Sequence, residues 1–303
     1  MVFDGKKLAQ EILDDLKAEM SSWKKKPFLA VVSLGPKSDN SSYILQKKKT
    51  AEFLGLGFEN YHYEDISSSK KIAAHLNKIA KMDKVSAMVV QMPLPQNVNS
   101  SVVNIIPVKK DPDLLSDKSV GLFFNGRSII DPPTPAGILK ILKSESVAVK
   151  NKKAVVLGHG RLVGRFLVPM LLHEGGAVSV IEKNTPKSIV LELSQGADII
   201  ISAVGQPNLI NIEMVKTGAA VIDAGFSLVD PVRSKTSGMS ADAPAHQISD
   251  GIDGKITGDV DFEAVKNKAG LITPVPGGIG PVGVAMLFYN VVKLYKYYYK
   301  NEQ

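Results

Sequence analysis

The chain of 303 residues contains no cysteine, so it has no disulfide, no thiolate ligand for a metal ion and no cysteine nucleophile. Its apolar runs are short, and none approaches the roughly 20 residues that a membrane-spanning helix needs. The first ten residues, MVFDGKKLAQ, lack the apolar stretch of a secretory signal, so we expect a cytosolic protein. The five histidines show no short ligand spacing. We therefore expect neither a resident metal nor a membrane partner.

The chain also lacks a long basic block, although its formal net charge is +7. Its lysines are scattered in small groups, and no recognisable nucleic-acid motif is present. The tail LYKYYYK, residues 294–300, interleaves aromatic and basic residues, but an amphipathic C-terminal helix explains it better than a base-stacking surface does. The charge favours an anionic small molecule as the partner and no nucleic acid.

What is present is the periodicity of an α/β protein, since short apolar runs rich in β-branched residues alternate with helical patterns along the chain. Continuous apolar runs suit strands buried on both faces of a parallel sheet. A length of 303 residues favours two domains or one large domain. The expected strands are 28–34, 86–92, 154–158, 177–181, 198–204 and 219–225, and the expected helices of the first half are 42–55 and 69–82.

Two segments interrupt this alternation. DPPTPAG, residues 131–137, has three prolines in five positions, which should prevent a regular element until the helical pattern of ILKILK begins. We expect the first domain boundary just after it. Residues 228–250 are polar and rich in small and turn-forming residues, which predicts a long loop within the second domain.

The segment AVVLGHGRLVGRF predicts a strand, a glycine turn and a helix, with glycines at 158, 160 and 164. Such a turn lets the backbone approach a pyrophosphate, whose charge the helix N-terminus stabilises. The spacing is not the usual dinucleotide fingerprint, but Glu182 closes the next strand 24 residues after Gly158, near where an acid would bind the adenosine ribose. A tight turn with a solvated glutamate is the alternative.

The segment SSYILQKKKT, residues 41–50, places three lysines on an expected helix that Asn40 would cap. Tyr43 and Lys47 are spaced i and i+4 and share one face, whereas Lys48 and Lys49 are turned about 100° and 200° away from it. A partly desolvated lysine can exchange protons near neutral pH. From spacing alone, a solvated helix face remains the simpler explanation.

Further stretches, taken in order along the chain, resemble one family. They are VVQMPLPQNV (89–98), IPVKKDPD (106–113), PPTPAGI (132–138), GHGRLVG (158–164), VIDAGF (221–226), GDVDF (258–262) and TPVPGGIGP (273–281). This order resembles the bifunctional methylenetetrahydrofolate dehydrogenase/methenyltetrahydrofolate cyclohydrolases from FDGKKLA, residues 3–9, to the final helix.

The resemblance implies an α/β catalytic domain that binds tetrahydrofolate, formed by residues 1–139 and 272–303, and a Rossmann-type NAD(P)-binding domain formed by residues 140–271. It places the substrate in a cleft between them. It also implies oxidation of 5,10-methylenetetrahydrofolate by hydride transfer to NAD or NADP, followed by hydrolysis of the methenyl product to 10-formyltetrahydrofolate. The implied assembly is a homodimer formed through the cofactor domains.

The resemblance also implies the site residues. Lys47 matches the catalytic lysine, Tyr43 the tyrosine before it, Gln91 the glutamine that tunes the lysine's protonation, and Asp113 the aspartate that hydrogen-bonds the pterin ring. The implied substrate-binding residues are Tyr43, Asn40, Gln91, Pro93, Leu94, Asp113, Pro274, Pro276, Gly277 and Gly278. The implied cofactor-binding residues are Thr134, Gly158, His159, Gly160, Arg161, Val163, Gly164, Glu182, Lys183, Ala203, Val204, Gly205, Asp223, Gly225, Gly277 and Gly278.

Departures from the family pattern bear on the cofactor. His159 and Gly160 replace an arginine and a serine that commonly favour the phosphate of NADP, and Glu182 and Lys183 replace a polar pair. A carboxylate at 182 would bind a ribose hydroxyl and repel a 2′-phosphate, so we expect NAD to be preferred over NADP. Arg161 or Lys183 can still hold a 2′-phosphate.

Other departures leave alternatives to the bifunctional enzyme. Asn40 replaces a serine, Pro112 and Leu114 alter the turn around Asp113, and Pro133 replaces a cysteine. A dehydrogenase without cyclohydrolase activity is one alternative, and a non-catalytic folate-binding protein is another. A dinucleotide-dependent dehydrogenase for a different substrate would leave PVPGG unexplained.

Overall fold

The computed structural model describes residues 1–35, 42–64, 68–229 and 255–299. The chain forms two compact units, and helices α1 (Gly5–Glu19) and α9 (Ile279–Tyr298) contribute residues to both. We call residues 9–133 and 284–303 the three-stranded unit, and residues 1–8 and 134–283 the five-stranded unit. The domain boundaries expected after residue 139 and before residue 272 stay predictions.

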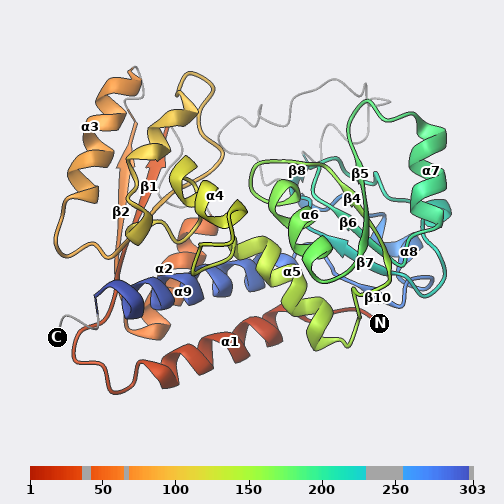
Figure 1. Cartoon of the computed structure of the whole chain (residues 1–303), viewed down its shortest axis with the longest axis horizontal. Helices are drawn as coiled ribbons and strands as arrows, with labels where there is room; N and C mark the ends of the chain where they lie inside the picture. The colour runs from red at the N-terminus through yellow and green to blue at the C-terminus, as the bar shows by residue number, and fades with distance from the viewer. Residues whose placement is uncertain (36–41, 65–67, 230–254, 300–303) are drawn as a thin grey trace. The chain divides into compact units, whose positions relative to one another are not determined.

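The three-stranded unit contains a parallel sheet in the order β2-β1-β3 (Figure 1). Its elements are β1 (Phe28–Leu34), α2 (Ser42–Leu54), β2 (Gly57–Tyr63), α3 (Ser69–Ala80), β3 (Ala87–Val90), the 3-10 turns η1 (Ser100–Ile105) and η2 (Val108–Lys110), and α4 (Asp117–Phe124). Because side chains alternate along a strand, Ala30 and Val32 of β1 join the core cluster on one face, while Leu29 and Val31 are buried on the other.

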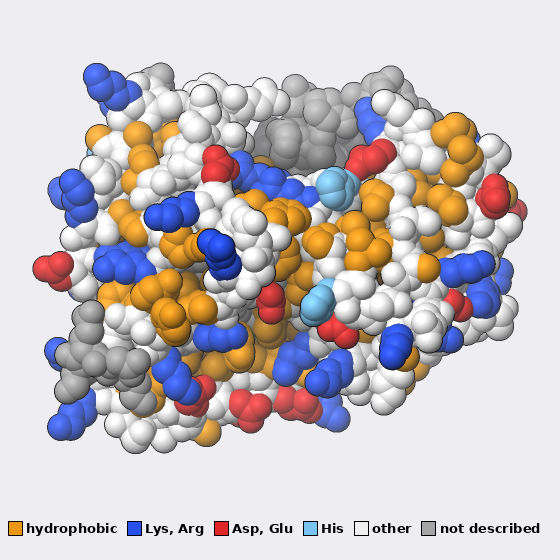
Figure 2. Space-filling model, in the orientation of Figure 1, with side chains coloured by type: hydrophobic (Ala, Val, Ile, Leu, Met, Phe, Trp, Pro, Cys, Tyr) orange, Lys and Arg blue, Asp and Glu red, His pale blue; other side chains and the backbone are white. Residues whose placement is uncertain are grey.

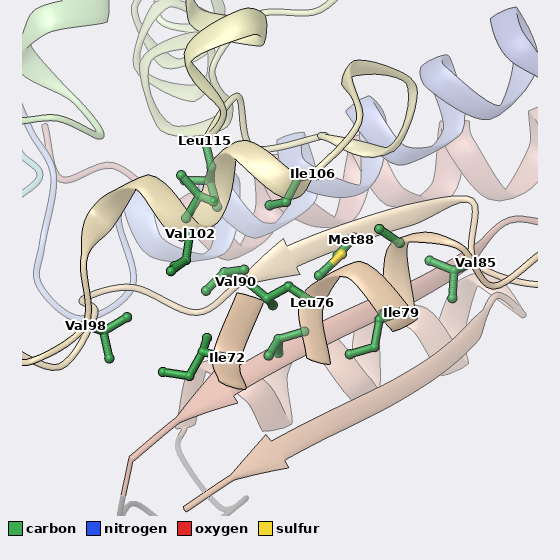
Figure 3. Packing of buried hydrophobic residues seen from close by; sticks show 14 residues of the cluster. Ile72, Leu76, Ile79, Val85, Met88, Val90, Val98, Val102, Ile106 and Leu115 are labelled. Atoms are coloured by element: carbon green, nitrogen blue, oxygen red, sulfur yellow. The ribbon is translucent and has the colours of Figure 1, made fainter. Parts of the chain in front are cut away.

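Helix α3 covers one face of this sheet through a single apolar stripe. Ile72, Leu76 and Ile79 follow the i, i+4, i+7 spacing of one helix face and pack in one cluster with Met88 and Val90 of β3 (Figure 3). Each such buried side chain contributes about 1.5–3 kcal/mol relative to exposure. This packing fixes β3, and therefore the residues that follow it.

The five-stranded unit contains a second parallel sheet, in the order β10-β7-β6-β4-β5 (Figure 1). Its elements are α5 (Pro133–Ser144), β4 (Lys153–Leu157), α6 (Gly164–His173), β5 (Ala177–Ile181), α7 (Lys187–Gln195), β6 (Ile199–Ser202), η3 (Ile212–Met214), β7 (Ala220–Asp223), α8 (Phe262–Val265) and β10 (Leu271–Ile272), and a hairpin-like pair β8 (Ser227–Val229) and β9 (Lys255–Thr257). The chain passes from β4 to β5 on one side and to β6 on the other. In such sheets, ligands bind at the carboxyl ends of the strands where this reversal occurs.

The structure confirms the expected α/β class and the expected strands, two of which, β1 and β5, have the expected bounds. The helices expected at 42–55 and 69–82 are α2 and α3. Strand β2 was not expected, because GFENYHY is half-buried along its whole length and shows no apolar run. Within the described ranges, no helix is both long enough and apolar enough to cross a bilayer.

Two expectations are wrong in detail. Residues 131–137 do not stay irregular, because α5 begins at Pro133 and includes Pro135. The first turn of a helix tolerates proline, since its N–H groups have no partner within the helix. The loop expected at 228–250 loses residues 228 and 229 to β8, which pairs antiparallel with β9, and its remaining residues lie outside the described residues.

Candidate active site

Helix α2 separates the three consecutive lysines by exposure. Successive residues of a helix are turned by about 100°, so three neighbouring side chains face different directions. Lys47 is only 8% exposed, whereas Lys48 and Lys49 are exposed, and Lys48 lies 4.0 Å from Glu52. Tyr43, one turn before Lys47, is half-buried. The structure therefore singles out Lys47 as the lysine removed from water.

The buried ammonium group has a neutral partner at the end of β3. Lys47 Nζ donates to Gln91 Oε1 at 2.6 Å, and Gln91 Nε2 donates to the carbonyl oxygen of Met92 at 2.9 Å. The backbone N–H of Gln91 also donates to Val32 of the neighbouring strand β1, at 2.8 Å. Both ends of the amide and its backbone are thus fixed, so its oxygen is held toward Lys47.

Asp113 acts on Lys47 electrostatically. Burial lowers the pKa of Lys47, and the charge of Asp113 raises it. Burial also raises the pKa of the half-buried Asp113 to about 7, a rise that Lys47 opposes and Asp111 increases. Burial raises the pKa of the Tyr43 phenol, which keeps its proton as a donor. An amine and a carboxyl shifted toward neutrality can exchange protons with a substrate near physiological pH.

The turn that carries Asp113 is held by its own residues. The Asp111 carboxylate accepts bonds from the N–H groups of Leu115 at 3.0 Å and Ser116 at 2.9 Å, and from the Ser116 hydroxyl at 2.7 Å. Leu114 has a φ of 50°, in the left-handed region that favours glycine, and is 2% exposed. Burial of its side chain offsets part of this backbone strain.

The remaining expected substrate residues of this unit have different surroundings. Pro93 is exposed after β3, whereas Leu94 packs against the core cluster, so part of its role is structural. Asn40 lies outside the described residues, so its expected contacts and its expected capping of α2 stay predictions.

A second group of residues lies at the carboxyl edge of the five-stranded sheet. The last residue of β4, Leu157, pairs with Ile181 of β5 and with Ser202 of β6, and Ser202 pairs with Asp223 of β7. The structure therefore brings together the residues that follow these strand ends. They are Gly158, Glu182, Ala203, Val204, Gly205 and Gly225, and they join Asp223, the last residue of β7; all seven are expected to bind the cofactor.

The glycine turn after β4 is shaped for close approach. Gly158 has a φ of 88°, and a Cβ on it would lie 2.9 Å from the carbonyl oxygen of Ala203. Gly164, the first residue of α6, leaves no room for a Cβ against the carbonyl oxygen of Gly158. At Gly160 a Cβ would meet nothing within 4 Å, so packing within the protein does not require a glycine there. This turn fits the pyrophosphate of a dinucleotide.

Glu182 lies beside this turn. The N–H of Gly158 donates to the carbonyl oxygen of Ile181, at 2.9 Å, and Glu182 is the next residue. The N–H of Glu182 donates to Thr185 Oγ1 at 3.0 Å, which fixes its backbone, while the residue is exposed. Its carboxylate is thus available to a ligand at the carboxyl ends of β4 and β5.

Sequence reasoning missed Asp259, although it lies in the quoted segment GDVDF. Its carboxylate is fully buried and accepts bonds from the Ser202 hydroxyl at 2.7 Å and from the N–H groups of Val204, Gly205 and Gln206 at 2.8, 3.3 and 2.7 Å. Asp259 therefore shapes the loop after β6, and the N–H groups of Val204, Gly205 and Gln206 are already bonded within the protein. An aspartate flanked by glycine and apolar residues is the signal for such a buried acceptor.

Asp223 has a structural role at the same edge. Its carboxylate accepts bonds from the N–H groups of Gly225, Asp259 and Val260, at 2.9, 3.1 and 2.9 Å. Burial raises its pKa to about 6 despite these bonds. A Cβ on Gly225 would collide with the Asp259 carboxylate, which explains this glycine by packing.

The segment PVPGG follows β10 at the edge of the same sheet. Thr273 Oγ1 accepts a bond from the N–H of Asp223 at 2.8 Å, which joins the start of this segment to β7. The N–H of Gly278 donates to the carbonyl oxygen of Pro274 at 2.8 Å, and Gly277 has a φ of 109° with open space around it. Pro274, Pro276, Gly277 and Gly278 thus form a tight turn before α9.

The other expected cofactor residues lie in the same unit. His159 and Lys183 are exposed, Arg161 and Val163 are half-buried, and Thr134 lies in the first turn of α5, where a Cβ on Gly283 would lie 3.3 Å from its hydroxyl. Among the described residues, no group of three or more His, Asp or Glu is arranged to hold a metal ion.

A parallel sheet with a glycine turn at its reversal point defines a Rossmann-type nucleotide-binding unit. With a second α/β unit that holds a buried lysine, the chain belongs to the class of two-domain α/β proteins with a nucleotide-binding unit.

Comparison with known proteins identifies the family. Residues 3–113 match the family model for the tetrahydrofolate dehydrogenase/cyclohydrolase catalytic domain, and residues 132–299 match the model for its NAD(P)-binding domain. The chain belongs to the tetrahydrofolate dehydrogenase/cyclohydrolase family.

Relatives match along almost the whole chain. The bifunctional protein FolD of Fusobacterium nucleatum is 34% identical over 302 residues, which cover 98% of each chain. The crystal structure of FolD from Campylobacter jejuni has a TM-score of 0.84 at 33% identity, covering 98% of this chain and 99% of that one. FolD of Trypanosoma brucei, solved with NADP and an inhibitor, has a TM-score of 0.87 at 29% identity, covering 99% of this chain and 98% of that one.

Proposed function

We propose that this protein oxidises 5,10-methylenetetrahydrofolate to the 5,10-methenyl form with NAD or NADP, and then hydrolyses that product to 10-formyltetrahydrofolate. The observation that carries the proposal is the buried Lys47, held at 2.6 Å by the uncharged Gln91 and influenced by Asp113. Family membership supplies the substrate class, since a buried lysine alone would fit several chemistries.

In the dehydrogenase step, a nicotinamide cofactor held by the five-stranded unit would supply the acceptor for the hydride that leaves the one-carbon bridge. The chain's own residues orient the substrate for this transfer. The Asp113 carboxylate accepts hydrogen bonds from the pterin ring, and the protonated Tyr43 phenol donates to the folate. The glycine turn at Gly158 and the carboxyl edge of the five-stranded sheet hold the dinucleotide. The expectation that the substrate binds between the two domains stays a prediction.

In the cyclohydrolase step, water adds to the carbon of the methenyl cation. The bond from this carbon to N5 then breaks as the proton of the new hydroxyl moves to N5, which leaves the formyl group on N10. Lys47 takes a proton from this water, and its lowered pKa makes the neutral amine available. Gln91 holds the amine without adding a negative charge, which would raise the pKa of Lys47 and keep it protonated. A dehydrogenase without this second step remains an alternative, because Leu114, which departs from the family pattern beside Asp113, has a φ of 50°.

For the cofactor, we propose that NAD is preferred. Glu182 is exposed beside Gly158, where its carboxylate would bind a ribose hydroxyl and repel a 2′-phosphate. The test compares kcat/KM for NAD and NADP in the wild type and in Glu182→Gln. Removal of the charge should shift the ratio toward NADP by about tenfold or more. An unchanged ratio would contradict the assignment, and Glu192→Gln, on α7, is the control.

We also propose a homodimer formed through the five-stranded units. Strand β5 is the last strand of its sheet, and Val180 on it is 37% exposed. Leu172 of α6 and Ile189 of α7 are also exposed apolar side chains of this unit. Pairing with a second copy would cover the outer edge of β5, which no other strand of the described residues covers. Figure 2 shows basic side chains spread singly or in small groups on one face, which gives no support to a nucleic-acid partner. A cytosolic location stays a prediction.

The decisive experiment measures initial rates of methylenetetrahydrofolate oxidation by the purified protein, with NAD and NADP in parallel, and quantifies methenyl and 10-formyl products. Turnover with release of 10-formyltetrahydrofolate above the uncatalysed rate supports both activities. Turnover that stops at the methenyl product supports the dehydrogenase alone. Folate binding without turnover under either cofactor would replace the proposal with the non-catalytic folate-binding protein.

A further inference from the structure

Asn290, in the middle of α9, is a buried polar side chain with two distant partners. Its Nδ2 donates to the carbonyl oxygens of Pro112 at 2.8 Å and of Asp131 at 2.7 Å, and the residue is 1% exposed. All three residues belong to the three-stranded unit. Since Pro112 directly precedes Asp113, the first of these bonds fixes the peptide that leads into Asp113.

The same face of α9 packs against the Asp113 turn over two further helical turns. Leu294 and Tyr298 follow Asn290 at i+4 and i+8, and both line a small cavity together with Asp111 and Leu114. The contact of Asn290 is therefore part of a continuous face of α9 that packs against the turn.

The bonds of the Asp111 side chain fix the turn only after Asp113, so the peptide before Asp113 depends on another contact. The Asp111 carboxylate holds the N–H groups of Leu115 and Ser116, which come after Asp113. Leu114, with its φ of 50°, adds strain that favours rearrangement. Asn290 supplies a bond before Asp113, so the two polar side chains hold the turn on either side of the catalytic carboxylate.

We infer that Asn290 is a positioning residue that fixes Asp113 in the arrangement through which it acts on Lys47. The inference rests on the proposed function, because it assigns a role to Asp113 in that reaction. Loss of the Asn290 bonds would let the turn relax and the carboxylate gain hydration. The charged groups that act on Asp113 are Lys47 and Asp111, and the substitutions below leave both in place.

The test measures kcat/KM for methylenetetrahydrofolate oxidation between about pH 5.5 and 9 in the wild type, Asn290→Ala, Asn290→Ser and Val292→Ala. Val292 is equally buried on α9 but is turned about 200° from Asn290, so its truncation loosens packing without touching the Asp113 turn. Serine keeps a single donor. Circular dichroism at each pH gives the fraction of folded enzyme, and the rates are corrected for it, so a variant that folds poorly can still be compared.

The limb in question is the part of the profile where kcat/KM changes as Asp113 gains or loses its proton. In Asn290→Ala, this limb should move to lower pH by about one unit or more, because hydration lowers the pKa of a carboxyl group. Asn290→Ser should lie between this variant and the wild type, and Val292→Ala should keep the wild-type limb. An unmoved limb in both Asn290 variants, or an equal movement in Val292→Ala, would overturn the inference. Lack of wild-type activity would instead overturn the proposed function.

Discussion

Two neighbouring lysines on α2 offer a matched test of the catalytic assignment. Lys47 is buried against Gln91, and Lys48 is exposed near Glu52, so the two share a helix but not an environment. Lys47→Met keeps the apolar stem and removes the amine. We expect cyclohydrolase kcat to fall by about 10²–10⁴, the range associated with loss of a general acid or base.

Lys48→Met should change this kcat by no more than about twofold, since exposed substitutions away from a site have small effects. Hydrolysis of methenyltetrahydrofolate, followed by absorbance, gives the rates, and circular dichroism checks the fold. A Lys47→Met variant that keeps most of its cyclohydrolase activity would refute the role of Lys47.

Asp113 gives a pH dependence of known sign. Its pKa rises from 3.8 to about 7 on folding, so the folded protein binds this proton more tightly than the unfolded chain does. The associated stability is complete below the unfolded pKa and is lost as the pH rises through about 7. Asp113→Asn has no proton to lose, so the free energy of unfolding of this variant should rise relative to that of the wild type between about pH 4 and 7.

We expect a relative gain of about 1–2 kcal/mol, less than the pKa shift alone implies because Asp113 is only half-buried. Urea unfolding at several pH values measures it. The exposed Asp15, as Asp15→Asn, is the control and should show no such trend. A difference between Asp113→Asn and wild type that stays constant with pH would show that the carboxyl is not desolvated as described.

At the scale of single residues, sequence could predict identities but not all environments. The spacing of Tyr43 and Lys47 and the motif around Gln91 indicated which residues to compare, and the structure supplies the burial that distinguishes Lys47 from Lys48. Asn290 was not predictable, because its partners are backbone carbonyls 178 and 159 residues away along the chain. Such a contact leaves no local pattern.

At the scale of elements, Lys110 shows how a buried cation can stabilise a helix end. Its Nζ donates to the carbonyl oxygens of Ala80 at 2.9 Å and Met82 at 3.1 Å, at the C-terminus of α3, and the residue is 6% exposed. A positive charge there also interacts favourably with the helix dipole. We expect Lys110→Met to reduce the free energy of unfolding by about 1.5–3 kcal/mol, the range for bonds to charged groups.

Lys109→Met is the matched control for this prediction, because Lys109 is exposed and its ammonium lies 5.6 Å from the ring of Tyr299. We expect it to cost no more than about 0.5–1 kcal/mol, the range of an exposed cation–π contact. Urea unfolding followed by circular dichroism compares the two variants. Equal stabilities of Lys110→Met and Lys109→Met would show that the two carbonyl contacts contribute nothing measurable.

The elements also show which parts of the fold a sequence reveals. Continuous apolar runs such as FLAVVSL predicted strands because a parallel sheet buries both faces. Strand β2 escaped prediction because every residue in it is only half-buried, which leaves no apolar signal. The start of α5 escaped for a different reason, since Pro133 and Pro135 resemble a helix breaker but occupy the first turn, where proline is tolerated.

At the scale of the whole molecule, one substitution on β5 should dissociate the proposed homodimer. Among the described residues, β5 is the last strand of its sheet, and such an edge presents backbone groups that can pair with another chain; Val180 adds apolar surface on this strand. In Val180→Lys, burial of a charged amine against a second copy would be unfavourable. We expect this variant to sediment as a monomer at concentrations where the wild type sediments as a dimer.

The control is Phe124→Lys, which replaces an apolar side chain that is 53% exposed on α4 of the three-stranded unit. If association depended on exposed apolar area in general, both substitutions would weaken it, whereas an interface through β5 is disrupted only by Val180→Lys. Sedimentation velocity over a concentration series separates these outcomes. A monomeric wild type would refute the dimer, and a dimer that persists in Val180→Lys but dissociates in Phe124→Lys would move the interface to the three-stranded unit.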